Sequence, residues 1–160
     1  MSSCTNHIIQ LRGYLGLFAS QEDRFPPITN TRQAFEAIAT KCGQVDLKWF
    51  SSYWASCPEA HESDGSIGHV FVAGGASTEV VSADKSMLVL FCPAESHRRS
   101  GRCHVVMGWG DLNRIESNAE MIELLRNEIR RGKEGEAPYA SSALQVMERE
   151  LTLREGFEKD

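Results

Sequence analysis

The chain has 160 residues, of which 41% are hydrophobic and 24% are charged. This length and balance are typical of one globular domain that builds a core of its own. The net charge is −5, from 17 basic and 22 acidic residues, and the basic residues form no cluster larger than Arg98-Arg99 or Arg130-Arg131. The composition therefore argues against a protein that binds nucleic acid.

The apolar segments of the sequence are short. The longest run covers residues 87–92, whereas a helix that spans a membrane needs about 20 apolar residues. The first residues also lack the basic and then apolar layout of a secretory signal peptide. We therefore expect this chain itself to be soluble.

The first predicted element is a helix over about residues 3–20. Its apolar positions recur at spacings of three and four residues: Ile8, Leu11, Leu15 and Phe18. This pattern predicts one helix face that packs on a core. Gly13 and Gly16 each weaken such a helix by about 1 kcal/mol relative to alanine, so we expect it to depend on packing. Phe25-Pro26-Pro27 cannot continue a helix.

A second helix is predicted over about residues 31–41, with Gly43 as its terminator. Residues 46–68 are expected to be irregular and to end in a polar loop. Carboxylates in this loop, those of Glu59, Glu62 and Asp64, indicate a solvated turn or a weak calcium site.

The pattern changes to strands after residue 68. Runs rich in valine, leucine and phenylalanine predict strands over residues 69–73, 87–92, 103–107 and 112–115. No helix is predicted between them, and short connections of this kind join antiparallel strands. We therefore expect an antiparallel sheet of three or four strands over about residues 69–115.

Two further helices are predicted after the sheet. Ser117-Asn118-Ala119-Glu120 is a capping box that begins a helix over residues 117–131. Residues 132–136 form a polar break, and a last helix follows over about 140–154. The order of elements predicts an α+β fold, with a main domain over residues 1–131 and the break and C-terminal helix over 132–160.

The five cysteines include no C-x-x-C pair, which argues against a zinc ribbon or a thioredoxin motif. If the strands over 87–92 and 103–107 form a hairpin, Cys92 and Cys103 face each other and are candidates for a disulfide. Reduced, buried thiols are the alternative.

Imidazole and thiolate groups also gather near the same strands, at His97, Cys103 and His104. These groups are ligands that zinc prefers, but their spacing matches no compact zinc signature. His104 should also point to the opposite sheet face from Cys103. No signature of a nucleophile surrounds any cysteine, so we expect neither an enzyme nor a bound cofactor.

The N-terminal segment resembles bacterial prepilin-like proteins related to the major pseudopilin of type II secretion. The residues that carry the resemblance share the order of that family's signature helix: Cys4, Asn6, Gln10, Leu11 and Phe18. Phe25-Pro26-Pro27 and Cys57-Pro58 follow in the order in which the family has them.

The second half resembles the same family's processing-associated domain, which is named for a histidine separated by nine residues from Asp-Gly. Glu95-Ser96-His97, Gly101 and residues 104–112 carry this resemblance. Trp109 stands where the family has the aspartate, and Asp111 where it has a second histidine. The resemblance covers about residues 3–115.

The resemblance implies a pilin-like fold, in which the N-terminal helix packs on the sheet through Ile8, Leu11, Leu15 and Phe18. It implies a non-catalytic structural subunit of a type IV pilus or type II secretion-like apparatus. Its partners would be sister subunits and the inner membrane, through an N-terminal segment absent from this chain, with the domain on the periplasmic or extracellular side of the cell envelope. The alternative is a soluble ligand- or metal-binding domain, for zinc or calcium, that uses the region of His97, Cys103 and His104.

Overall fold

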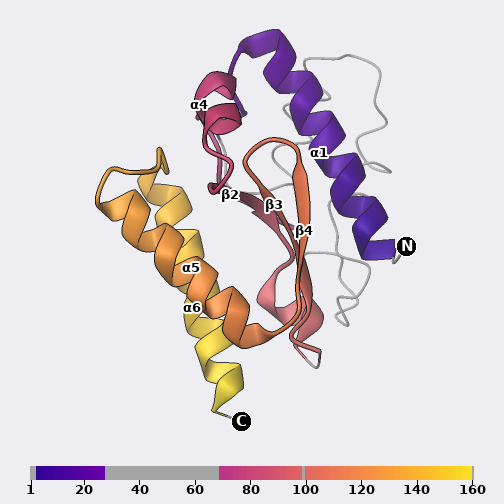
Figure 1. Cartoon of the computed structure of the whole chain (residues 1–160), viewed down its shortest axis with the longest axis vertical. Coiled ribbons are helices and arrows are strands. Elements are labelled where there is room, and N and C mark those ends of the chain that lie inside the picture. Colours follow the sequence, from indigo (N-terminus) through magenta and orange to yellow (C-terminus); the bar gives the residue numbers. More distant parts are fainter. Residues whose placement is uncertain (1–2, 28–68, 99, 160) are drawn as a thin grey trace.

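The computed structural model describes residues 3–27, 69–98 and 100–159 (Figure 1). The predicted helix over 31–41, the acidic loop and the cysteines at 42 and 57 lie outside the described residues. The helices in this part of the chain are α1 (Ser3–Glu22), α4 (Thr78–Ala83), the short 3-10 helix η1 (Ala94–His97), α5 (Asn118–Lys133) and α6 (Ser141–Glu158). The strands are β1 (Val70–Phe71), β2 (Leu88–Phe91), β3 (Cys103–Met107) and β4 (Asp111–Ile115).

The four strands form one sheet in the order β1-β2-β3-β4, and each strand runs antiparallel to its neighbours. The α+β class and the antiparallel sheet that the sequence predicts are confirmed. Gly108 turns the chain between β3 and β4 with a φ of 56°. A side chain there would place its Cβ 2.9 Å from the Cα of Lys85, so this turn requires glycine on two counts.

Helix α1 packs on the sheet and contacts β2 and β3. Ile8, Leu11 and Leu15 are fully buried in the same apolar cluster as the strands, and Phe18 is partly buried against it. The turn between β3 and β4 also contacts this helix, because the Arg12 guanidinium donates a hydrogen bond to the carbonyl of Gly110.

Helices α5 and α6 pack against each other, and α5 contacts β4. In Figure 1 the strands lie between α1 and this helix pair. Strand β2 is buried along its whole length, as expected for a strand that is covered on both faces. Ala143 and Met147 of α6 belong to the same apolar cluster as Ile8 of α1, so the C-terminal helix completes the main core.

The capping box at the start of α5 differs in detail from its expected form. The Ser117 hydroxyl accepts a hydrogen bond from the Glu120 amide at 3.2 Å, as predicted. The Glu120 carboxylate accepts from the amide of Glu116 at 3.0 Å rather than from that of Ser117. Both hydrogen bonds of the capping box are therefore formed at the N-terminus of α5, but the carboxylate bonds the amide one residue before the N-cap.

Two short helices, α4 and η1, were not predicted. The sequence does contain a signal for α4, since Ser77 caps this helix by accepting a hydrogen bond from the amide of Val80. Helix α5 also continues through Gly132 to Lys133, beyond its expected end at residue 131. Strand β1 has two residues, fewer than the predicted five.

Candidate functional site

The structure gathers two cysteines and a histidine from distant parts of the sequence. Cys4 lies in the first turn of α1, His69 directly precedes β1, and Cys92 directly follows β2. Because Val70 pairs with Phe91 in antiparallel register, the next position along the ladder places His69 beside Cys92. The docking of α1 on the sheet then brings Cys4 to the same point.

These three residues, which we call the Cys4 cluster, are in close contact. The Cys4 Sγ lies 3.2 Å from the Cys92 Sγ and 3.9 Å from the His69 Nε2. All three possible ligand atoms lie within 4.8 Å of one another. Cys4 and Cys92 are fully buried and His69 is 2% exposed, so the cluster belongs to the interior of the protein.

The chemistry of the Cys4 cluster is that of a soft ligand set. Thiolate and imidazole are the preferred ligands of zinc and are also used for Cu⁺. A catalytic thiol needs contact with solvent and substrate, and burial of both thiols removes that contact. The cluster therefore suits metal binding or a structural role better than nucleophilic catalysis.

The backbone on both sides of Cys92 is held by neighbouring elements. The Cys92 amide donates to the carbonyl of His104 at 3.3 Å, and the Arg154 guanidinium donates to the Cys92 carbonyl at 2.9 Å. The Glu150 carboxylate of α6 accepts a hydrogen bond from the Ala94 amide at 2.8 Å. Burial of Glu150 raises the pKa of its carboxyl group, against the opposing effect of that hydrogen bond.

The region that the sequence indicated as a possible metal site has a different arrangement from the Cys4 cluster. Cys103 is buried in β3, and the next residue, His104, is only partly buried, as alternation along a strand predicts. The His104 Nε2 lies 3.1 Å from the Thr5 hydroxyl of α1. The side chain of His97 lies outside the described part of the structure. Among the described residues, the three close metal-type ligands are instead those of the Cys4 cluster.

Cys92 and Cys103 do not lie opposite each other as expected, because the pairing of β2 with β3 is shifted by one residue. Phe91 pairs with Val105, so the position after Phe91 lies beside His104 rather than Cys103. Cys4, Cys92 and Cys103 are thiols in the structure, and the predicted disulfide is not formed in it. The sequence missed the Cys4 cluster because its contacts depend on this register and on where α1 docks.

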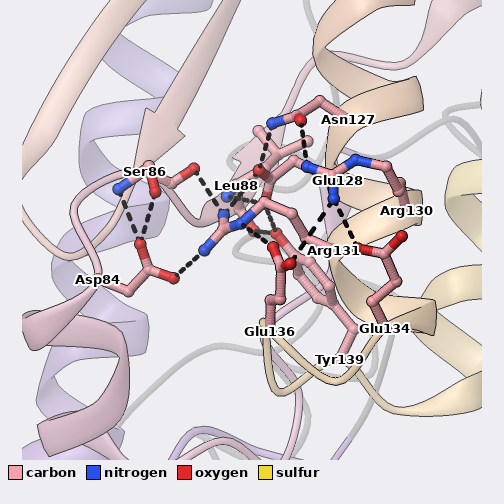
Figure 2. A network of polar contacts seen from close by, with 10 residues as sticks. All are labelled: Asp84, Ser86, Leu88, Asn127, Glu128, Arg130, Arg131, Glu134, Glu136 and Tyr139. Carbon is pink, nitrogen blue, oxygen red and sulfur yellow. Dashed lines mark hydrogen bonds and ion pairs between the residues drawn. The ribbon is translucent and has the colours of Figure 1, made fainter.

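A second polar cluster lies between α5 and the start of β2 (Figure 2). Glu128 of α5 is fully buried. Its carboxylate accepts hydrogen bonds from the Leu88 amide at 3.2 Å, from the Arg131 guanidinium at 2.8 Å and from the Tyr139 hydroxyl. Arg131 also pairs with Asp84 at the end of α4. The carboxylate is thus surrounded by donors from β2, from α5 and from the connection between α5 and α6.

The charges in this second cluster stabilise one another. The hydrogen bond to Glu128 is the largest cause that raises the pKa of Arg131. Burial, followed by the negative charge of Glu128, raises the pKa of the Tyr139 hydroxyl. Burial opposes ionisation of Asp84, but hydrogen bonds from Ser86 and Arg131 outweigh it and lower the pKa of that carboxyl group. These contacts hold α5 to the sheet, which is a structural role.

Comparison with known proteins found no matching family model, no matching curated protein and no matching solved structure. Within the described residues, no helix combines the length and the apolar character needed to cross a bilayer.

Proposed function

We propose that this chain is the globular part of a pilin-like structural subunit, of a type IV pilus or a type II secretion-like apparatus, and has no catalytic role. The observation that carries the proposal is the placement of α1, whose buried stripe lies on β2 and β3 of an antiparallel sheet. The order of the prepilin-like motifs over about residues 3–115 supports the same assignment, with Trp109 and Asp111 as departures from the family pattern.

The outward side of α1 also supports a subunit that assembles through this helix. Among its 20 residues, α1 carries only Arg12 and Glu22 as fully charged side chains. Its outward positions include Gln10 and Gly13, and Leu17 is 45% exposed. A small, uncharged and partly apolar helix face lets a second helix approach closely. The face suits a second copy of the subunit.

The surface of α5 differs from that of α1. Its exposed side carries Glu123, Arg126 and Arg130, and the first two form an ion pair at 2.8 Å. Solvated charges of this kind are depleted in the centre of protein interfaces. We therefore assign the contact between sister subunits to α1 and use α5 as the control surface.

The resemblance supplies the cellular setting of the proposal. Prepilin-like subunits reach the envelope through an apolar N-terminal segment and expose their globular domain outside the inner membrane. We propose the same location for the full-length protein, with sister subunits and the inner membrane as its partners.

Site-specific photo-crosslinking tests this assignment in the cells that make the protein. A photoreactive phenylalanine derivative at Leu17 is expected to give products at multiples of the subunit mass, whereas the same group at Glu123 is expected to give few. Equal products from the two positions, or products with unrelated proteins only, would contradict the proposal.

A second candidate function, metal binding, is favoured by one observation, the geometry of the Cys4 cluster. The earlier alternative placed such a site at His97, Cys103 and His104. The contacts described above favour Cys4, His69 and Cys92 as the ligands instead.

A further inference from the structure

We propose that Cys4, His69 and Cys92 form a buried site for a thiophilic cation with a filled d shell, Zn²⁺ or Cu⁺, that fastens the first turn of α1 to the sheet. This inference does not depend on the pilin-like function. It concerns how the N-terminal helix is held, whatever the helix does on its outward side.

The distances in the Cys4 cluster are close to those of a metal site. With bonds of about 2.3 Å to sulfur and 2.0 Å to nitrogen, neighbouring ligand atoms on one metal lie roughly 3.5–4 Å apart. The two sulfur atoms are 3.2 Å apart, and Cys4 Sγ and His69 Nε2 are 3.9 Å apart. The third pair, Cys92 and His69, has its ligand atoms within 4.8 Å of each other. A disulfide needs a sulfur separation of about 2.05 Å. A small outward shift of the two sulfurs therefore matches the sulfur separation on a metal, whereas a disulfide needs a larger inward movement.

The site is also arranged before any metal enters. Cys92 is held through its amide and its carbonyl by His104 and Arg154. Ile8 and Leu11, the next buried apolar positions of α1, pack in the core and fix the helix that carries Cys4. Preformed ligand positions reduce the ordering cost of binding, so the metal's binding energy contributes more fully to stability.

Charge and ligand number favour the two cations differently. Binding converts two thiols into thiolates and releases two protons, and His69 binds as neutral imidazole. With Zn²⁺ the site is then electrically neutral, which burial favours, but zinc in structural sites almost always has four ligands. With Cu⁺ the three ligands found among the described residues suffice, and these ligands together with the ion carry one negative charge. The shared chemistry is soft thiolate ligation.

Metal titration of the reduced, metal-free chain tests the proposal in two separate arms, one with Zn²⁺ and one with Cu⁺, under anaerobic conditions. Co²⁺ serves as the optical probe for the zinc arm through its thiolate charge-transfer band. We expect one equivalent of at least one cation to stay bound through gel filtration and to raise the melting temperature.

The matched variants are Cys92→Ser, which removes a ligand, and Cys103→Ser, which alters a buried cysteine outside the cluster. We expect Cys103→Ser to keep the bound metal and the rise in melting temperature, and Cys92→Ser to lose both. Equal binding by Cys92→Ser and the unchanged chain would overturn the assignment.

A measurement on the unchanged chain guards against variants that fail to fold. Bound metal should protect two cysteines from alkylation, and peptide mapping should identify them as Cys4 and Cys92. Protection of other cysteines, or no binding of either cation, would overturn the proposal. A disulfide between Cys4 and Cys92, found in protein from cells whose thiols were blocked at lysis, would also overturn the proposal.

Discussion

The Sγ atoms of Cys4 and Cys92 lie 3.2 Å apart, although 88 residues separate them in the sequence. This contact joins the first turn of α1 to the end of β2, next to His69. The buried stripe of Ile8 and Leu11 continues the same attachment along the helix. The N-terminal helix is therefore held both by apolar packing and by a compact polar cluster at its start.

The two glycines of α1 are predicted to respond differently to alanine. Nothing lies within 4 Å of a Cβ at Gly13, whereas a Cβ at Gly16 would lie 3.0 Å from the Trp109 ring. Gly13→Ala should therefore stabilise the fold by up to about 1 kcal/mol through helix propensity, and Gly16→Ala should lose that gain by displacing Trp109. Chemical denaturation of both variants measures the difference, and a larger gain for Gly16→Ala would contradict the packing of α1.

Removal of the Glu128 carboxylate is predicted to be costly. Glu128→Ala removes the acceptor of the buried Leu88 amide and one of the two carboxylates nearest the Arg131 guanidinium, which keeps its contact with Asp84. Loss of one member of a buried pair costs about 3 kcal/mol or more. Tyr139→Phe removes a single hydroxyl donor, which lies near both the Leu88 carbonyl and the Glu128 carboxylate, and should cost about 1 kcal/mol. Exposed Glu123→Ala is the control and should change the free energy of unfolding by less than about 0.5 kcal/mol. Similar losses for Glu123→Ala and Glu128→Ala would refute the structural role of this cluster.

Asp84 is predicted to stabilise the fold at neutral pH and to lose this effect in acid. Its folded-state pKa is lowered from 3.8, so its contribution is complete above that value and disappears as the pH falls through the folded-state pKa. The stability difference between the unchanged chain and Asp84→Asn should therefore be largest at neutral pH and should shrink below about pH 4. Urea denaturation over a pH series measures this, and a constant difference would show that ionisation of Asp84 is irrelevant.

Glu150 is predicted to show the opposite pH dependence. Burial raises its folded-state pKa from 4.5, so the folded chain holds the proton more tightly and its contribution is complete below that value. The contribution is lost as the pH rises from about 4.5 through the raised pKa. Because Gln still accepts a hydrogen bond from Ala94, the unchanged chain should lose stability relative to Glu150→Gln over this range. If the unchanged chain instead gained stability relative to Glu150→Gln over this range, the inference that the ionised Glu150 carboxylate is costly to bury would be contradicted.

Local sequence patterns predicted the elements whose determinants are local. The spacing of Ile8, Leu11 and Leu15 predicts a helix with one buried face, and Ser117 marks the beginning of α5. Alternation along β3 correctly separates Cys103 from His104. The cap at Ser77 was overlooked, although its signal for α4 is of the same local kind.

The candidate site could not be predicted in this way, because its contacts depend on tertiary structure. A shift of one residue in the pairing of β2 and β3 places Cys92 beside His104 instead of Cys103, and strand register is set by the whole ladder. The approach of Cys4 depends in addition on how α1 docks on the sheet. Neither relationship is visible in residue spacing.

Sequencing of the genomic DNA that precedes the codon for Met1 tests whether this chain is a pilin-like subunit. The proposal predicts an in-frame upstream sequence with a prepilin-type cleavage site, a start similar to Phe-Thr-Leu-Ile-Glu and about 20 apolar residues that lead into α1. An in-frame stop codon directly upstream, with no such segment, would contradict it.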